Sequence, residues 1–222
     1  MIVIILTLIA AIALGTIFSK FLPKNNTGNT GTDGKTAKTD SEKESVNVSK
    51  EIPEANIKDY VAIQCGVFSK KEGALELKNS LMKLGTPFII EENNSNRVLL
   101  GIYPSESVDI IIKQLNENNI GYVKIKFQLI AKDMASAQIN EMVSADIKIL
   151  NRLSEKDTIS YPTVDLKKWL TSLTGAEEKS ENYAAMTEIK TYLTALPAEL
   201  KKEKTEEGYI YIYKFIKKVL KI

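Results

Sequence analysis

The side chains best suited to hold a ligand fall in three short segments of the first half of the chain. They are Gln64 in the first segment, Arg97 and Leu99 in the second, and Tyr122, Lys124 and Lys126 in the third. A primary amide both donates and accepts hydrogen bonds, and the cationic side chains only donate them. Cationic groups pair with carboxylates, and a phenol ring offers a flat face for stacking. The set therefore provides the means to bind a polar ligand.

The chain has few of the residue types that enzymes use for catalysis. There is no histidine among the 222 residues, which removes the commonest general base near neutral pH and the commonest metal ligand. Cys65 is the only cysteine, and its ordinary role is that of a small buried hydrophobe. The net charge is only +2, which gives no global reason to expect a nucleic-acid binder. We therefore predict a protein that is not an enzyme and needs no cofactor or metal.

The three segments lie in a stretch that alternates strand and helix signals. A capping-box pattern at Ser69–Glu72 opens the first predicted helix, and the asparagine-rich stretch 93–96 is a turn signal. The predicted strands are 60–67, 88–92, 97–103 and 122–127, with helices at 69–85 and 104–119. This βαββαβ order is typical of an α+β, ferredoxin-like fold, in which two helices cover one face of a four-stranded antiparallel sheet.

Strand alternation assigns each side chain to one face of this predicted sheet. The apolar parity is expected to face the two helices; it consists of Ile63, Cys65, Val67, Val98, Leu100, Val123, Ile125 and Phe127. The other parity is expected on a helix-free face, with Gln64 beside Leu99 on the central strands. Tyr122, Lys124 and Lys126 are assigned to the same open face, where a partner would lie.

Two of the segments resemble a known family. The run IQCGVFS (63–69) resembles the VQVGAFS first strand of SPOR domains, the sporulation-related repeats of bacterial cell-envelope proteins. The run RVLLGIY (97–103) resembles the RVRVGPF third strand of the same family. A helix signal follows each motif, and the resemblance covers residues 59–129, about a third of the chain.

The resemblance implies a function. SPOR domains bind septal peptidoglycan at glycan strands that have lost their stem peptides, during division or sporulation. It implies glycan contacts for Gln64, Arg97, Leu99 and the third segment, with Lys124 and Lys126 meeting lactyl carboxylates and Tyr122 stacking on a sugar. Division or sporulation proteins are the further partners that it implies, and nucleic acid is not among them.

The N-terminal segment 1–22 is predicted to be a transmembrane helix. Ile2–Ser19 contains no charged residue and would span about 27 Å as a helix, close to the thickness of the hydrocarbon core. A cleaved signal peptide is the alternative, and a start upstream of Met1 is also left open. Lysines follow the span, so the positive-inside rule alone favours a cytoplasmic C-terminal side. Access to peptidoglycan requires the opposite, and we expect a single-pass membrane protein whose C-terminal part is extracytoplasmic.

The remaining segments have different characters. Residues 23–58 are rich in Asn, Thr, Gly, Ser, Lys and Glu, which predicts a disordered linker. Residues 130–222 show helical periodicity at 139–153, 164–173, 183–196 and 206–222, which predicts a helical C-terminal region. We expect its helices to pack on one another or on the sheet. The last helix is basic and amphipathic, so contact with a membrane surface is an alternative to packing.

Two other functions fit parts of the sequence. SPOR domains are often fused to cell-wall amidases or lytic transglycosylases, so the chain is alternatively an accessory module of a hydrolase complex. If the chain were itself such an enzyme, Glu141 or Glu188 would be its lone acid, but a lone Glu on a helix is usually solvated, and the lack of histidine excludes the zinc amidase type. RNA-binding domains of the RRM type share the βαββαβ order. They need aromatic residues on the open face of the central strands, whereas this chain has Gln64 and Leu99 there.

Overall fold

The computed structural model describes residues 57–222, called the folded unit below. The predicted transmembrane helix at 1–22 lies outside the described residues, as does the predicted linker at 23–58 up to its last two residues. Those two, Ile57 and Lys58, begin the first strand. The predicted linker therefore extends two residues too far.

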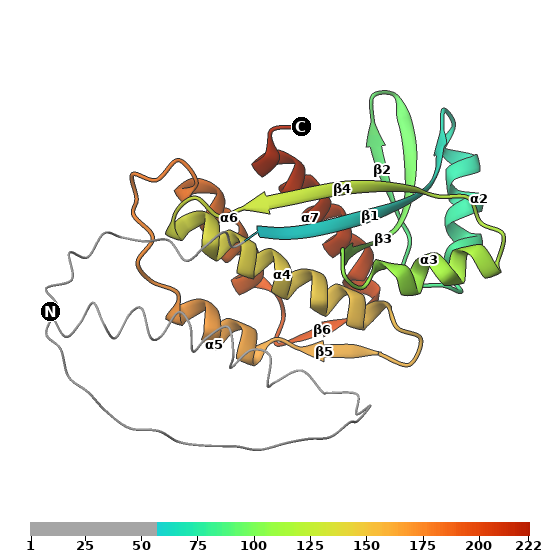
Figure 1. Ribbon diagram of the computed structural model, residues 1–222. Coiled ribbons are helices and arrows are strands. Elements are labelled where there is room, and N and C mark those ends of the chain that lie inside the picture. Colours follow the sequence, from blue (N-terminus) through green and yellow to red (C-terminus); the bar gives the residue numbers. More distant parts are fainter. Residues whose placement is uncertain (1–56) are drawn as a thin grey trace, which may run out of the picture. The chain divides into compact units, whose positions relative to one another are not determined.

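The first part of this unit has the predicted βαββαβ order. Its elements are β1 (Ile57–Phe68), α2 (Lys71–Leu81), β2 (Phe88–Glu92), β3 (Ser95–Pro104), α3 (Val108–Glu117) and β4 (Val123–Ile130). The four strands form one antiparallel sheet in the order β2-β3-β1-β4. The two motif-bearing strands, β1 and β3, are therefore neighbours at the centre of the sheet (Figure 1).

Asparagines make two of the turns. Asn93 and Asn94 have φ values of 50° and 56°, the left-handed pair that a two-residue hairpin between β2 and β3 requires. Asn119 has φ 53° just after α3, where it ends the helix. The capping box predicted at Ser69 does not form: α2 begins at Lys71, and no side chain caps its first turn.

A glycine and an aromatic residue two positions later mark the exit of each central strand. A Cβ on Gly66 would lie 2.7 Å from the Phe68 ring, and a Cβ on Gly101 would lie 2.6 Å from the Tyr103 hydroxyl. Each ring thus lies over its glycine. The β1–β3 register shifts beside Gly66 and between Ile63 and Gln64, as in β-bulges. These glycines leave room for the rings where the two strands end.

One face of the sheet packs on α2 and α3. Val61 and Ile63 of β1 and Val98 and Leu100 of β3 share this core with Ala74, Leu81, Val108, Ile111 and Leu115 of the two helices. Cys65, Phe68 and Tyr103 are partly buried against the same core. The predicted inward parity is confirmed for Val98 and Leu100 of β3 and for β1 as far as Cys65. Beyond Cys65 the bulge changes the alternation of β1.

The second part of the unit is mostly helical, as predicted. Its elements are α4 (Met134–Ser154), β5 (Ser160–Pro162), α5 (Val164–Ser172), α6 (Tyr183–Ala195), β6 (Glu199–Lys201), a 3-10 turn (Lys202–Lys204) and α7 (Thr205–Leu220). The sequence analysis missed the short β5–β6 ladder, in which Tyr161 pairs with Leu200. The Asp133 carboxylate and the Ser136 hydroxyl form a capping box at the start of α4.

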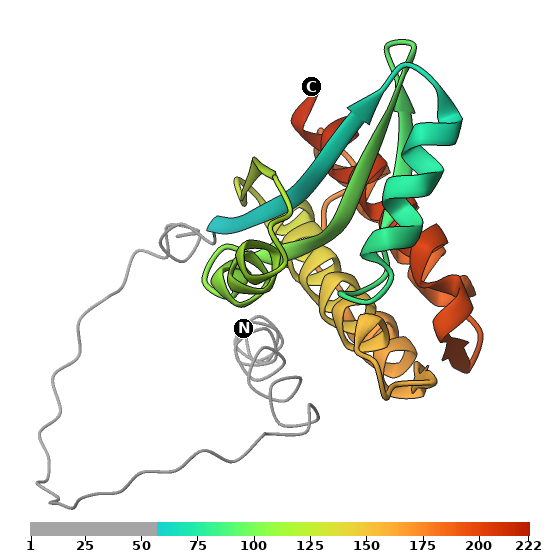
Figure 2. The ribbon, with the colours of Figure 1, turned by 90° about the vertical axis from the view of Figure 1, so that its right-hand side faces the viewer.

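The other face of the sheet is also covered by helices: the C-terminal helices pack on it, which is one of the two expected arrangements, and the predicted helix-free face is therefore wrong. Phe88 of β2 stacks on Tyr209 of α7 with ring centroids 5.3 Å apart, and Phe127 of β4 meets the edge of Tyr213 at 5.7 Å. In Figure 1, α7 crosses behind the strands and α4 runs beside them, and Figure 2 shows the same elements after a quarter turn. The fold therefore has three layers: α2 and α3, the sheet, and the layer that contains α4 and α7. The last helix, α7, packs on the sheet.

The helical layer of α4 and α7 shares one hydrophobic core with the sheet. Phe88, Leu99, Phe127 and Leu129 are at most 2% exposed, and Tyr209, Ile212 and Ile216 of α7 are fully buried. A Cβ on Gly208 would lie 2.4 Å from Cδ2 of Leu150, so α7 packs very closely on α4 at this point. The boundary predicted after residue 129 therefore does not separate two independent cores.

Within residues 57–222, no helix is both long enough and apolar enough to cross a membrane.

Candidate functional site

Gln64 is buried inside the protein and already has a partner. Its side chain is 9% exposed, and its Oε1 accepts a hydrogen bond of 2.8 Å from Nη1 of Arg97. Arg97 also pairs with Glu92, with its Nε 3.4 Å from the carboxylate, and Glu92 accepts a hydrogen bond from Lys217 of α7. The amide and the guanidinium predicted to bind glycan thus belong to an internal polar network.

Leu99 lies under the same helical layer. It is opposite Phe88 on one side and Gln64 on the other, and it is fully buried. The open face predicted for Gln64, Arg97 and Leu99 is therefore absent from the described protein, because α4 and α7 cover it. Gln64 and Leu99 were expected to face solvent, and both are buried instead. The side chain of Arg97 is only partly exposed.

The third segment faces the other way from Gln64, which also corrects the prediction. Lys124 lies directly opposite Ile63, and Lys126 lies opposite Val61. Directly opposed residues of antiparallel strands share a face, so both lysines lie on the α2/α3 side. Val123, Ile125 and Phe127 instead share the face of Gln64, contrary to the predicted alternation.

The physical reason is that β4 has two different surroundings. On the side of α4 and α7, Phe127 and Leu129 of its apolar parity are buried, whereas Val123 at the start of the strand is exposed. On the side of α2 and α3, Lys124 and Lys126 are exposed, so these helices leave the outer part of the strand open. The sequence analysis assumed a single helical layer and therefore assigned the two parities of β4 to the wrong faces of the sheet.

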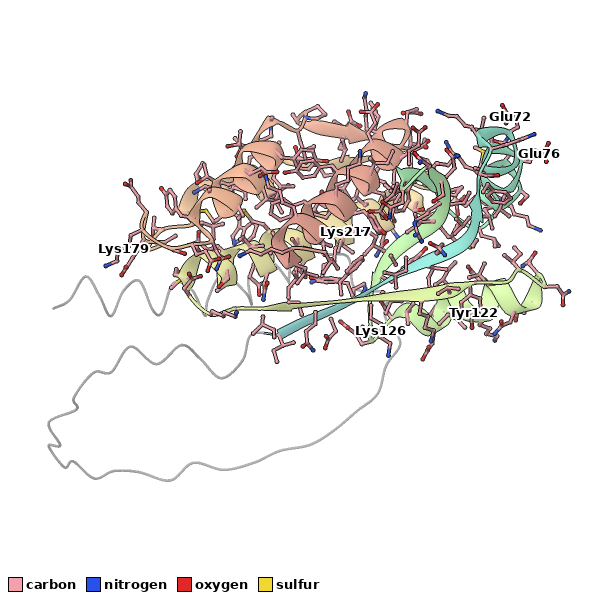
Figure 3. The ribbon with its side chains drawn as sticks, turned by 90° about the horizontal axis from the view of Figure 1, so that it is seen from above. Glu72, Glu76, Tyr122, Lys126, Lys179 and Lys217 are labelled. Carbon is pink, nitrogen blue, oxygen red and sulfur yellow. The ribbon has the colours of Figure 1, made fainter. Side chains whose placement is uncertain are left out.

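The structure nevertheless brings three of the predicted residues together on one line. Tyr122 immediately precedes β4, Lys124 and Lys126 follow at two-residue intervals within the strand, and Gln128 continues the same parity; these four residues are named the β4 row. Neighbouring members are about 7 Å apart along the strand. Figure 3 shows Tyr122 and Lys126 along the outer edge of the sheet, whereas Lys217 lies over the helical layer.

The members of the β4 row differ in exposure and partners. Tyr122 is half-buried against the α2/α3 core, which fixes its ring at the edge. Gln128 is exposed, and its amide donates a 3.0 Å hydrogen bond to Asp59. Among the described residues, no ion pair or hydrogen bond engages the ammonium of Lys124 or Lys126. The sequence analysis missed Gln128, although the same two-residue spacing indicates it.

The groups available for chemistry elsewhere are engaged or protonated. Burial raises the pKa of the Cys65 thiol to about 11, so it is not an activated nucleophile at neutral pH. Glu141 pairs with Lys58 at 3.4 Å, and Glu188 pairs with Lys218 at 2.6 Å. No group of His, Cys, Asp or Glu side chains suited to hold a metal ion occurs in residues 57–222.

Comparisons with known proteins give one likeness. No family model matches the chain, and no curated protein matches it. A solved structure, the solution structure of the peptidoglycan-binding domain of the B. subtilis cell wall lytic enzyme CwlC, is similar to part of it. The sequence identity is 17%, the match covers 36% of this chain and 98% of that chain, and the TM-score is 0.28.

Proposed function

We propose that this protein is a non-enzymatic cell-wall binding protein that holds peptide-stripped glycan strands of septal peptidoglycan along the β4 row. The observation that carries the proposal is the exposure of Lys124 and Lys126 on one line of an edge strand, with the half-buried ring of Tyr122 just before the strand. The pairing of the two SPOR-like segments as central strands, each with its glycine under an aromatic ring, also supports it.

The chemistry of the ligand fits this row. A stripped glycan strand is a long polymer that carries hydroxyl and acetamido groups and the lactyl carboxylates of muramic acid. Lys124 and Lys126 offer two cations to carboxylates, and the Gln128 amide both donates and accepts hydrogen bonds. The half-buried ring of Tyr122 offers a fixed apolar surface to a sugar. An extended, shallow row suits a linear polymer.

The buried central strands restrict where the ligand is held. While α4 and α7 are packed, glycan does not reach Gln64 or Leu99, because both lie beneath these helices. The same covering opposes the RNA-binding alternative, since an RRM stacks bases on that face of its central strands. The proposal therefore differs from the implied family mode in the surface that it uses.

We also propose that the protein is anchored in the membrane by its N-terminal segment and that its C-terminal part is extracytoplasmic. The proposal rests on the need to reach peptidoglycan. A cysteine introduced at the exposed Lys168, in a Cys65→Ser background, would report the location. An impermeant maleimide should label it in intact cells; labelling only after permeabilisation would place the described part in the cytoplasm.

Co-sedimentation with sacculi tests the binding activity. We expect the purified protein to sediment with sacculi whose stem peptides have been removed by an amidase, and to bind intact sacculi less well. We also expect no release of soluble muropeptides above a heat-inactivated control. Equal recovery with and without sacculi would refute glycan binding, and release of muropeptides would favour the hydrolase alternative.

A further inference from the structure

A carboxylate lies at the centre of the helical layer. Asp146 is in the middle of α4 and is fully buried. It falls on the same stripe of the helix as Met142, Ile149 and Leu150, which are all apolar and at most 1% exposed. An ionised carboxylate in such a place is strongly disfavoured unless it is paired.

Asp146 has no such pairing. Within residues 57–222, neither of its oxygens has a hydrogen-bond partner, and no ion pair involves it. Burial is the cause that raises its pKa from an ordinary value near 3.8 to about 8. At neutral pH the packed protein therefore holds this side chain as a neutral acid.

The groups around Asp146 come from the two helices packed on α4. Burial raises the pKa values of Tyr192 of α6 and of Tyr209 and Tyr211 of α7, and Asp146 adds to each rise, so these phenols are its titratable neighbours. The rings of Tyr192 and Tyr211 stack with centroids 3.5 Å apart, and the buried hydroxyl of Tyr211 also lacks a partner among the described residues.

The carboxylates that act on these tyrosines offer Asp146 no opposite charge. Glu188 of α6 and Glu207 of α7 also act on the tyrosines of this cluster, and they pair with Lys218 and Lys204 respectively. On the other side of α4, the sheet contributes Tyr60, which interacts with Ser144 and Glu141 of α4. No cation is directed at Asp146 from any of these elements.

We propose that Asp146 is a proton-controlled latch: its neutral form allows α6 and α7 to pack on α4, and its ionisation loosens these two helices. The latch depends on a desolvated site between three helices, and not on a surface charge. Because α7 covers the central strands, release of the latch would also expose Gln64 and Leu99. The inference stands whether or not the protein binds glycan, since it concerns the helical layer alone.

The direction of the pH dependence follows from the protonation of Asp146 in the packed and the opened states. In an opened state Asp146 meets water and ionises near pH 4, whereas the packed state keeps its proton up to about pH 8. Between these values, opening releases a proton, so raising the pH favours opening. The opening equilibrium should rise by up to about tenfold per pH unit, and this dependence should level off above about pH 8.

Hydrogen exchange of the full chain, in a mild detergent and between pH 5 and 8.5, tests the latch. After correction for intrinsic exchange rates, amides of α6 and α7 should lose protection with rising pH before those of β1 and β3 do. Asp146→Asn, which stays neutral, should remove this pH dependence. Asp109→Asn, at an exposed position of α3, should retain it.

The outcomes separate clearly. A wild-type chain whose α6 and α7 protection does not change with pH overturns the proposal, whatever the variants do. So does a loss of protection that is equal in all elements, because that would be global unfolding. If Asp146→Asn fails to fold, Asp146→Leu provides the neutral variant, and pH dependence that persists in it also contradicts the latch.

Discussion

Gln64 and Arg97 are joined across the two central strands by a hydrogen bond of 2.8 Å, between Oε1 of the amide and Nη1 of the guanidinium. This bond connects the two SPOR-like segments directly. It also leads, through Glu92, to Lys217 of the last helix. The two residues that the family resemblance assigns to the ligand thus help to hold the C-terminal region against the sheet.

Replacement of Gln64 should therefore reduce stability. Gln64→Ala removes a mostly buried acceptor from a charged donor, an interaction that is typically worth about 1.5–3 kcal/mol. We expect a matching loss of unfolding free energy in urea denaturation. Gln128→Ala is the control, because that amide is exposed; surface changes of this kind usually shift stability by about 0.5 kcal/mol or less. Equal stability of the two variants would mean that the network contributes nothing.

Removal of the C-terminal region should prevent folding of what remains. A fragment of residues 57–129 would expose Phe88, Leu99, Phe127 and Leu129, and each buried side chain of this size contributes about 1.5–3 kcal/mol. We expect the fragment to aggregate or to lack a cooperative thermal transition, whereas residues 57–222 should unfold cooperatively. A soluble fragment with a sharp melt would show that the sheet folds without its second helical layer.

Much of this fold could be predicted from the sequence. The residues of β2 were predicted without error, and the βαββαβ order, the central pairing of β1 and β3 and four C-terminal helices are also as expected. These features depend on local signals: alternation, helical spacing and asparagine turns. Local signals report which elements form and which face of each is apolar.

Local sequence patterns do not indicate on which surface a helix that is distant in the sequence packs. Periodicity indicates an apolar face on α7, yet it does not say whether that face meets other helices or the sheet. Lys217 and Glu92 lie 125 positions apart, and nothing near either residue indicates their contact. Strand alternation placed Gln64 on the face opposite α2 and α3, and that face was taken to be open because only one helical layer was assumed. The faces assigned to the two parities of β4 followed from the same assumption and were wrong.

The contact between α4 and α7 allows a matched pair of substitutions. Gly208→Ala would place a Cβ 2.4 Å from Leu150, and overpacking of this kind typically costs about 1–3 kcal/mol. For a unit of this size that corresponds to a fall in Tm of roughly 2–12 °C. Gly121→Ala is the control, because nothing lies within 4 Å of the added Cβ. Similar melting temperatures for the two variants would show that α7 is free to move away from α4.

The central claim is that glycan binds along the β4 row while the central strands stay covered. Its most direct test compares the binding of Lys124→Gln/Lys126→Gln, Gln64→Ala and Lys168→Gln/Lys179→Gln to peptide-stripped sacculi, well below the melting temperature of each. Exposed ion pairs contribute about 0.2–1 kcal/mol each, so the first variant, which removes two of them, should bind about twofold to thirtyfold more weakly. Gln64→Ala and the Lys168/Lys179 control should bind like the parent. Loss of binding in Gln64→Ala together with full binding in Lys124→Gln/Lys126→Gln would contradict the account and place the glycan on the central strands.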